Sequence, residues 1–322
     1  MREVAFINQN KEKWLEVEAI LSKNQKISPD QMADNYIHLL GDLSFSQTYY
    51  PKSNTTIYLN FLVSQIYRKI YKTKRIDKNR LSFFFTDEIP LLLYKQRKVI
   101  YFSFLLFFFF CFIGALSAHY EPLYAREILG DSYVNMTLEN IEKGDPMAVY
   151  KSGTNWGSFI GITVNNIKVA FYAFLSGISA GVFTFYIGLS NGVMVGAFQY
   201  FCYDAGAFEA SLRAIWLHGA MEIFSIIIAM ASGFILALSI LFPKTYSRIL
   251  SFKIGFRESF YILLATVPFF IAAGFIEGFI TRYYYTMPLW LNITIIFGTL
   301  SFISYYFLIY PFIKHKKSKQ YE

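Results

Sequence analysis

Charged residues are scarce in this sequence of 322 residues, and their scarcity excludes an ordinary soluble domain. Asp, Glu, Lys and Arg together make up only 16% of the chain, whereas they make up roughly a quarter of a typical soluble protein. Hydrophobic residues make up 55%, and they include 35 Phe and 25 Tyr. An apolar excess of this size is typical of a chain whose outer surface faces lipid. The composition therefore indicates an integral membrane protein.

Cysteine is also rare, because the chain has only Cys111 and Cys202, both within apolar stretches. We interpret them as small hydrophobic residues and expect no disulfide. The first residues, MREVAFINQNKEKW, lack the apolar core of a signal peptide, so we expect the first internal apolar run to direct insertion. The net charge of +8 comes from Lys and Arg beside apolar runs, which is the positive-inside pattern. We therefore expect a lipid bilayer as partner and no nucleic acid.

Residues 1–82 lack an apolar run long enough to cross a bilayer and show helical periodicity instead. Apolar residues recur at helical spacing around Trp14, Leu39 and Leu62. The stretch SPDQ at 28–31 is a capping-box pattern with proline at the first helical position, and it predicts the start of a helix. We predict a small helical domain that lies in the cytoplasm.

Apolar segments that can cross a bilayer, which takes about 20 residues, follow this domain. Before them, residues 83–98 combine an aromatic cluster with acidic and basic residues. That mixture predicts an interfacial elbow helix on the membrane surface. In the transmembrane domain, 99–313, we place spans at 99–119, 167–187, 190–203, 213–242, 259–281 and 288–312. The expected fold class is all-α, a polytopic helical membrane protein with about six transmembrane helices.

The charges of the connecting segments indicate the orientation. The predicted loop 120–166 is acidic in its first part, whereas the connection after residue 242 and the tail 314–322 are basic. The positive-inside rule therefore places both termini in the cytoplasm and the loop outside it. Termini on one side require an even number of crossings. We therefore count the short segment 190–203 as the sixth span, with the turn before it marked by Asn191–Gly192.

Glycines recur at intervals of four residues in the apolar half of the chain. This small-xxx-small spacing lets membrane helices approach each other closely. The same faces would also allow a homo-oligomer. The glycines that we expect at helix-packing positions are Gly177, Gly181, Gly188, Gly192, Gly196, Gly219 and Gly278.

A few polar and ionisable residues interrupt the apolar spans. His218 and Glu222 are four residues apart, so on a helix they share one face. An ionisable side chain inside a membrane is costly and usually faces protein or water. We therefore predict one polar cluster inside the bundle. Its expected members are Asn165, Asn166, Asn191, His218, Glu222 and Glu277.

Three roles stay open for this cluster. Its hydrogen bonds could fix which helices pair, or the same residues could line a relay for protons or ions. His218, Glu222 and Glu277 could also bind a metal ion, but only the spacing favours this. A zinc protease helix carries two histidines, as in H-E-x-x-H. We therefore expect no metal and no cofactor.

The sequence also lacks the patterns of common catalytic sites. No Ser or Cys has the setting of an activated nucleophile. The glycines lie in apolar helices and lack the strand–loop–helix context of a phosphate-binding loop. We expect no catalytic residue, and hence a protein that is not an enzyme.

Several segments resemble the stage II sporulation protein M family of bacterial integral membrane proteins. They are NNIKVAFYAFLSG, GLSNG, HGAMEI and AAGFIEGFIT. The N-terminal helices, with Trp14–Leu15, YYP and YLN, resemble the longer members of that family. The resemblance implies a multi-span protein of the bacterial inner membrane that, in spore formers, works with cell-wall hydrolases at the engulfing membrane. Members are often encoded near other small membrane proteins and AAA-type ATPases, which implies a role in assembly.

Composition and resemblance together lead to a functional expectation. We expect a non-enzymatic membrane scaffold or assembly factor that positions other membrane or envelope proteins. The alternative is a channel or transporter-like subunit that uses the buried polar cluster.

Overall fold

The regular elements are all helices in the part of the chain that the computed structural model describes, which is residues 2–22, 28–70, 79–151 and 153–320. The chain forms two compact units, 1–78 and 79–322, where the sequence suggested a boundary at 82. Six helices of the second unit are long and apolar enough to cross a membrane. The expectation of an all-α polytopic membrane protein is confirmed.

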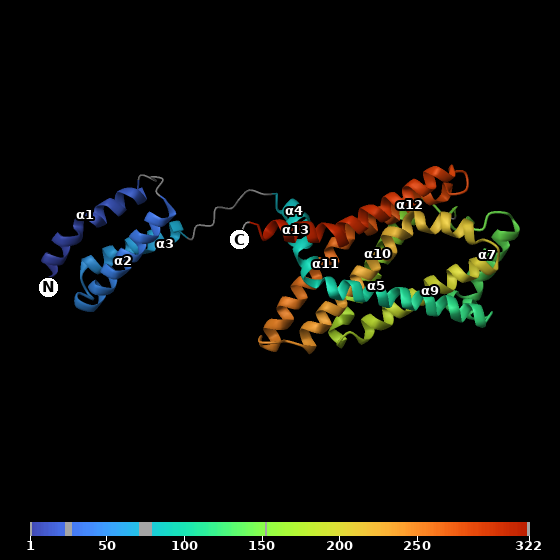
Figure 1. The fold of residues 1–322 in the computed structure, drawn as a ribbon, viewed down its shortest axis with the longest axis horizontal. Coiled ribbons are helices and arrows are strands. Elements are labelled where there is room, and N and C mark those ends of the chain that lie inside the picture. The colour runs from blue at the N-terminus through green and yellow to red at the C-terminus, as the bar shows by residue number, and fades with distance from the viewer. Residues whose placement is uncertain (1, 23–27, 71–78, 152, 321–322) are drawn as a thin grey trace. The chain divides into compact units, whose positions relative to one another are not determined.

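The N-terminal unit is a three-helix bundle. Its helices are α1 (Glu3–Ser22), α2 (Pro29–Tyr49) and α3 (Asn54–Ile70) (Figure 1). The SPDQ pattern starts α2 as predicted, because the Ser28 hydroxyl accepts from the Gln31 backbone N–H at 3.2 Å and the Gln31 side chain accepts from Ser28 in return. The core is formed by Phe6, Trp14, Val17, Leu39, Leu43, Leu59, Leu62, Val63 and Ile66. Residues 71–78 lie outside the described residues.

Side-chain hydrogen bonds join α1 to both other helices of this bundle. The Trp14 indole donates to Asp42 of α2 at 2.8 Å, and the Tyr58 hydroxyl of α3 donates to Glu18 at 2.7 Å. Burial and the bond to the Glu18 carboxylate raise the pKa of Tyr58 to about 12, since both disfavour the phenolate. These bonds add pairing specificity to the apolar core.

The membrane unit is built around α10, of whose most apolar stretch 72% is buried, against 11% for the last membrane helix. The elements of this unit (Figure 1) are α4 (Arg80–Phe83), η1 (Phe84–Glu88), α5 (Ile89–Tyr120), α6 (Tyr124–Leu129), α7 (Asp131–Glu142), η2 (Ala148–Lys151), α8 (Asn155–Leu175), η3 (Ser176–Ser179), α9 (Val182–Asp204), α10 (Phe208–Leu241), α11 (Arg248–Phe275), η4 (Ile276–Ile280), η5 (Thr281–Tyr283), α12 (Leu289–Ser304), η6 (Tyr305–Ile309) and α13 (Tyr310–Ser318). Helices α5, α8, α9, α11 and α12 all pack against α10.

The predicted elbow does not end at residue 98. After α4 and the π-helical turn η1, helix α5 begins inside the expected elbow and runs without interruption past residue 98 and through the first span. In Figure 1, α4 lies across the direction of α5. The boundary predicted at residue 98 is wrong, because charges influence how deep a segment lies but do not break a helix. Pro90 lies in the first turn of α5, directly after the π-helical turn η1.

The second and third spans are displaced from their predicted positions. Helix α8 occupies 155–175 rather than 167–187, so the last part of the predicted loop 120–166 is helical. The turn lies at 176–181, where Ala180 and Gly181 have positive φ. It does not lie at Asn191–Gly192, which is inside the full-length helix α9. The polar residues at the start of α8 lowered its hydropathy, and evenly spaced glycines do not distinguish a turn from a packing face.

The basic tail is not a free extension, because the last helix continues into it. Helix α13 includes most of the predicted tail 314–322, of which residues 321–322 lie outside the described part. Lys314 Nζ lies 2.6 Å from Asp87 Oδ1, and the His315 ring stacks on Tyr94 with centroids 3.8 Å apart. The tail therefore packs on the start of α5.

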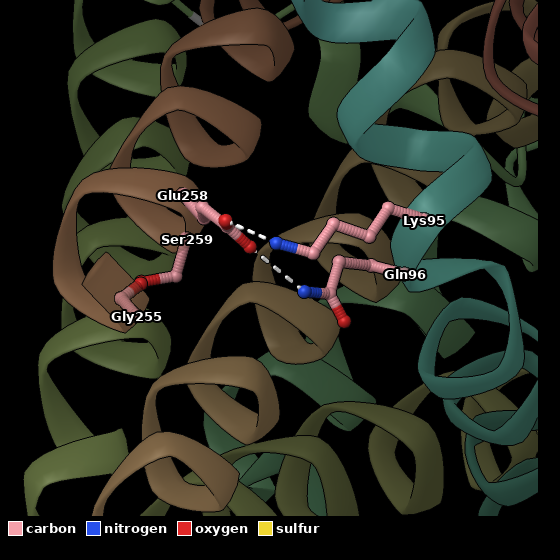
Figure 2. Close-up of polar contacts among 5 residues, drawn as sticks. All are labelled: Lys95, Gln96, Gly255, Glu258 and Ser259. Atoms are coloured by element: carbon pink, nitrogen blue, oxygen red, sulfur yellow. Dashed lines mark hydrogen bonds and ion pairs between the residues drawn. The ribbon is translucent and has the colours of Figure 1, made fainter. Parts of the chain in front are cut away.

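The start of α5 is also tied to α11 by a polar contact. Figure 2 shows Lys95 and Gln96 directed at the Glu258 carboxylate. Lys95 forms an ion pair with Glu258, and the Gln96 amide donates to it at 2.9 Å. On the neighbouring turn the Ser259 hydroxyl donates to the Gly255 carbonyl at 2.6 Å, within α11. Glu258 is thus neutralised at this end of the unit.

Helix α9 packs directly on the backbone of α5 through glycines. A Cβ at Gly196 would lie 1.9 Å from the carbonyl oxygen of Cys111, and Gly192 faces the same helix. In return, a Cβ at Gly114 of α5 would lie 2.2 Å from the carbonyl oxygen of Val193. No side chain fits at such distances, so the contact requires glycine on both helices.

Three further glycines lie where η3 and α9 meet α10. A Cβ at Gly177 would lie 2.2 Å from the carbonyl oxygen of Gly233, and one at Gly188 would overlap the sulfur of Met230. Gly181 has φ +88, a conformation that other residues rarely adopt. Gly177 and Gly181 thus belong to the turn between α8 and α9, and Gly188 lets α9 pack closely on α10.

Candidate functional site

His218, on α10, is oriented by the end of α11. The side chain is only 5% exposed, and its Nδ1 lies 3.1 Å from the hydroxyl oxygen of Thr281. The Thr281 hydroxyl donates to the Ile276 carbonyl at 3.3 Å, so it accepts from Nδ1–H. This tautomer leaves Nε2 of the imidazole with a free lone pair.

Two carboxylates converge on that nitrogen. His218 Nε2 lies 4.0 Å from Glu222 Oε2 and 3.6 Å from Glu277 Oε2. Glu222 is one helical turn further along α10, as the spacing predicts, whereas Glu277 comes from η4. The carboxylate side chains are 23% and 13% exposed respectively. Three acceptor atoms therefore face one another within the membrane unit.

The π-helical segment η4 presents Glu277 to this point. A π-helical turn inserts an extra residue into a helix and thereby redirects side chains, and such turns are frequent at functional sites. Gly278 lets this segment lie against the start of α8, because a Cβ there would lie 2.9 Å from the carbonyl oxygen of Asn155. The backbone of α8 thus supports the segment that carries Glu277.

These side chains line a cavity of about 650 Å³ between α8, α9 and α10. Asn165 and Asn166 enter it from α8, and Asn166 makes a side-chain hydrogen bond to Glu222. The other lining residues are Ile128, Leu129, Tyr133, Tyr150, Gly161, Ile162, Met194, Val195, Phe198, Gln199, Ile215, Gly219 and Ile223. The cavity is large enough for several water molecules or a small ligand.

The connection between α5 and α8 covers the cavity on one side. Tyr133 of α7 and Tyr150 of η2 both line it, and the Tyr150 ring packs edge-on against His218 with centroids 5.5 Å apart. Burial raises the pKa of Tyr133 to about 12 and holds that of Tyr150 well above its usual value, with a further contribution from Glu277. Both hydroxyls therefore stay protonated and can donate hydrogen bonds into the cavity.

The cavity ends part of the way along α10. Beyond Ile223, every residue from Phe224 to Gly233 is buried, among apolar side chains of the neighbouring helices. Ser225 and Ser232 are the polar residues in that stretch. In the described residues, the polar site thus opens toward α6, α7 and η2 and is closed toward the other end of α10.

The structure brings together five of the six residues of the predicted cluster. Asn165, Asn166, His218, Glu222 and Glu277 line one cavity, but the expectation for Asn191 is wrong. Its amide donates to the Ile187 carbonyl at 2.8 Å inside α9, because this is the nearest acceptor on its own helix face. The prediction that Gly219 is a helix-packing glycine is also wrong. Gly219 lines the cavity, and a Cβ there would meet only side chains of α10 itself, at 3.4 Å or more.

Sequence reasoning missed several polar residues of the site. Thr281 is four residues from Glu277 and Gln199 is the one glutamine of α9, so the argument that identified His218 and Glu222 would have found them. Gln199 Oε1 is buried without a hydrogen-bond partner. Tyr133 and Tyr150 carry no such signal, because only the fold of the connection places them over the cavity.

The charges of the site are unbalanced. Two carboxylates and one imidazole converge, and the residues that line the cavity in the described part of the chain include no Lys or Arg. Like charges at this distance in a poorly solvated site are unfavourable unless a proton or a cation lies between them. The nitrogen of His218 and one oxygen from each carboxylate lie within 4.8 Å of one another, a grouping that could hold a metal ion.

Models of known protein families match residues in both units. Residues 103–282 match the model of stage II sporulation protein M, and residues 4–72 match a domain of unknown function, DUF8413. No curated protein and no solved structure matches the chain significantly. The first match covers more than half of the chain and includes α8 to α11 with His218, Glu222 and Glu277. The chain therefore belongs to the stage II sporulation protein M family.

Proposed function

We propose that this protein is a non-enzymatic scaffold of the bacterial cytoplasmic membrane that positions partner proteins in envelope or cell-wall processes. The observation that carries this proposal is the closed end of the polar site. A channel needs a polar path across the bilayer, whereas the buried stretch Phe224–Gly233 fills the other half of α10. Polar side chains confined to one place are better suited to holding α8, α10 and α11 in one arrangement.

The separate N-terminal unit supports the same proposal. A helical bundle outside the membrane gives the protein a second surface on which a partner could bind. We further propose that this bundle and the C-terminus lie in the cytoplasm. Basic residues gather at the end of the membrane unit that holds α4, α13 and the α10–α11 connection. The segment 121–151 at the other end, which includes α6 and α7, is mainly acidic, and this is the distribution that the positive-inside rule describes.

Co-purification at native expression level tests the scaffold. The tagged chain is crosslinked in intact cells, extracted in mild detergent and analysed by quantitative mass spectrometry. A scaffold predicts at least one membrane or envelope protein enriched in stoichiometric amount. The matched control is an unrelated six-span membrane protein with the same tag and abundance. Recovery of the chain alone, equal to the control, would contradict the proposal.

A transporter-like subunit is the second candidate, and the cavity of about 650 Å³ favours it. A protein that opens alternately to each side also has a closed half in any one state. Purified protein in liposomes decides between the candidates. Proton or cation flux from the chain alone, abolished by Glu222→Gln, would support transport. Flux equal to that of empty liposomes would contradict transport and leave the scaffold as the proposed function.

A further inference from the structure

We propose that His218, Glu222 and Glu277 form a binding site for one divalent transition-metal ion, with Zn²⁺ as the probe ion. The proposal is independent of the scaffold function, which needs only that the helices stay together. It rests on the tautomer of His218, the geometry of the three ligand atoms and the charge of the cavity.

The hydrogen bonds of His218 prepare the imidazole as a ligand. Its Nδ1–H is donated to Thr281, at 3.1 Å, and the Thr281 hydroxyl is itself fixed by the Ile276 carbonyl. Metal-binding histidines usually donate their second ring nitrogen in this way, which fixes the tautomer and the ring orientation. The free Nε2 therefore points at the carboxylates with a lone pair rather than a hydrogen.

The three ligand atoms have nearly the spacing that a metal requires. Ligand atoms around a zinc ion, at bonds of about 2.0–2.2 Å, lie about 3.0–3.6 Å apart. The observed separation is 3.6 Å to Glu277 and 4.0 Å to Glu222, and all three atoms lie within 4.8 Å of one another. Metal binding would draw the Glu222 carboxylate closer to the other two ligand atoms. The adjoining cavity has room for water as a fourth ligand.

The charge of the cavity favours a doubly charged ion over a single proton. The residues that line the cavity include no Lys or Arg in the described part of the chain, so no positive side chain there balances the two carboxylates when both are ionised. A divalent cation makes the assembly neutral, which is the favourable state in a medium of low dielectric constant. One imidazole nitrogen with two carboxylate oxygens is a donor set that suits zinc and manganese.

The surroundings of the site add outer contacts to these ligands. Asn166 hydrogen-bonds Glu222, and Gln199 Oε1, which lines the same cavity, is buried without a protein partner. That oxygen is an acceptor for a metal-bound water, since such a water is a strong hydrogen-bond donor. The metal would join α10 to the π-helical end of α11, below the cover formed by Tyr133 and Tyr150.

Metal titration of the purified full-length chain tests the proposal. The protein carries a tag without histidine, is stripped with EDTA, and is titrated with ZnCl₂ against a chromogenic chelator, with elemental analysis of the bound metal. We expect about one Zn²⁺ per chain. We expect each of His218→Gln, Glu222→Gln and Glu277→Gln to weaken binding by at least about tenfold, and Thr281→Val by roughly tenfold. Glu258→Gln is the matched control, because this carboxylate pairs with Lys95 outside the cavity, and it should bind like the wild type.

Thermal unfolding gives a second readout that does not depend on the chelator. Zn²⁺ should raise the Tm of the wild type and of Glu258→Gln but not that of the Glu222→Gln/Glu277→Gln double variant. If that double variant does not fold, Thr281→Val, which keeps all three ligands, carries the test through its weaker binding. Less than about a tenth of an equivalent of bound metal in the reloaded wild type would overturn the proposal. Equal affinity of the wild type and the Thr281→Val and Glu277→Gln variants would do the same.

Discussion

At the scale of single residues, the chemical role of His218 depends on the side chains that other segments place around it. On α10 alone it is a buried histidine one turn from Glu222. Thr281 of η5 and Glu277 of η4, the turns that follow α11, give it an acceptor for one ring nitrogen and a second carboxylate for the other. The side chain thereby joins α10 to a segment whose contacting residue, Thr281, is 63 positions further along the sequence.

Substitutions of Glu222 separate a hydrogen-bonding role from a packing role. Glu222→Gln keeps the shape and the bond to Asn166, so we expect a yield of folded protein near that of the wild type. Glu222→Leu leaves Asn166 without its partner, and an unsatisfied buried polar group costs about 1–3 kcal/mol. Fluorescence-detected size-exclusion chromatography measures both. Equal yields for the two variants would exclude a structural role for this carboxylate.

In the N-terminal unit, the bond from Trp14 to Asp42 is the contact most sensitive to a conservative change. Trp14→Phe retains most of the apolar ring but removes the donor at 2.8 Å, and we expect a loss of about 1 kcal/mol. Limited proteolysis of the full chain measures this loss, because a less stable bundle should be cleaved faster within residues 2–70 in the variant than in the wild type. Leu15→Ala, at a half-exposed position (49%), is the control and should change the rate little.

At the scale of elements, the helices are held by two different kinds of contact. Helix α5 meets α9 through backbone contacts at glycines, whereas α5 meets α11 through the ion pair of Lys95 with Glu258. The first kind tolerates no added atoms, because protein interiors have few voids. The second is partly exposed, so it contributes little to stability and mainly selects the partner helix.

Alanine substitutions at two glycines compare a glycine between packed helices with a glycine that lines the cavity. Gly196→Ala places a Cβ 1.9 Å from the Cys111 carbonyl oxygen and forces α9 away from α5, so we expect a markedly lower Tm in detergent. Gly219→Ala meets nothing closer than 3.4 Å, and it should leave the Tm within a few degrees of the wild type. A Gly196→Ala variant as stable as Gly219→Ala would show that α5 and α9 are not packed this closely.

At the scale of the whole molecule, six crossings fix which connections share a side. Connections 121–154, 205–207 and 284–288 lie at one end of the membrane unit, and 176–181 and 242–247 lie at the other with α4 and α13. In Figure 1, α7 and α4 are accordingly at opposite ends of this unit. The site therefore faces the compartment that receives α6 and α7.

Cysteine labelling in intact cells tests this arrangement. In a chain whose native cysteines are replaced by alanine, a membrane-impermeant maleimide should label Glu142→Cys but label Tyr246→Cys only after the cells are opened. Both positions are exposed. A reporter fused after Ala207 should read as extracytoplasmic. A cytoplasmic signal from the reporter at Ala207 would show that α9 does not cross the membrane. The two termini would then lie on opposite sides.

The sequence by itself determined the class of this protein, because composition and periodicity report how much of each face meets lipid. It also predicted that His218, Glu222, Glu277 and the asparagines of α8 would meet, since buried polar groups must find partners. It misplaced the turn between α8 and α9, because the glycines that pack helices and the glycine that turns the chain are alike in spacing.

Only the tertiary structure decided which polar residues form the site and which do not. Asn191 finds its acceptor on its own helix, whereas Tyr133 and Tyr150 reach the cavity from the connection between α5 and α8, outside the membrane spans. The π-helical turn that directs Glu277 toward His218 is likewise absent from any local pattern. Each of these outcomes depends on contacts between segments far apart in the chain, and a local propensity cannot encode them.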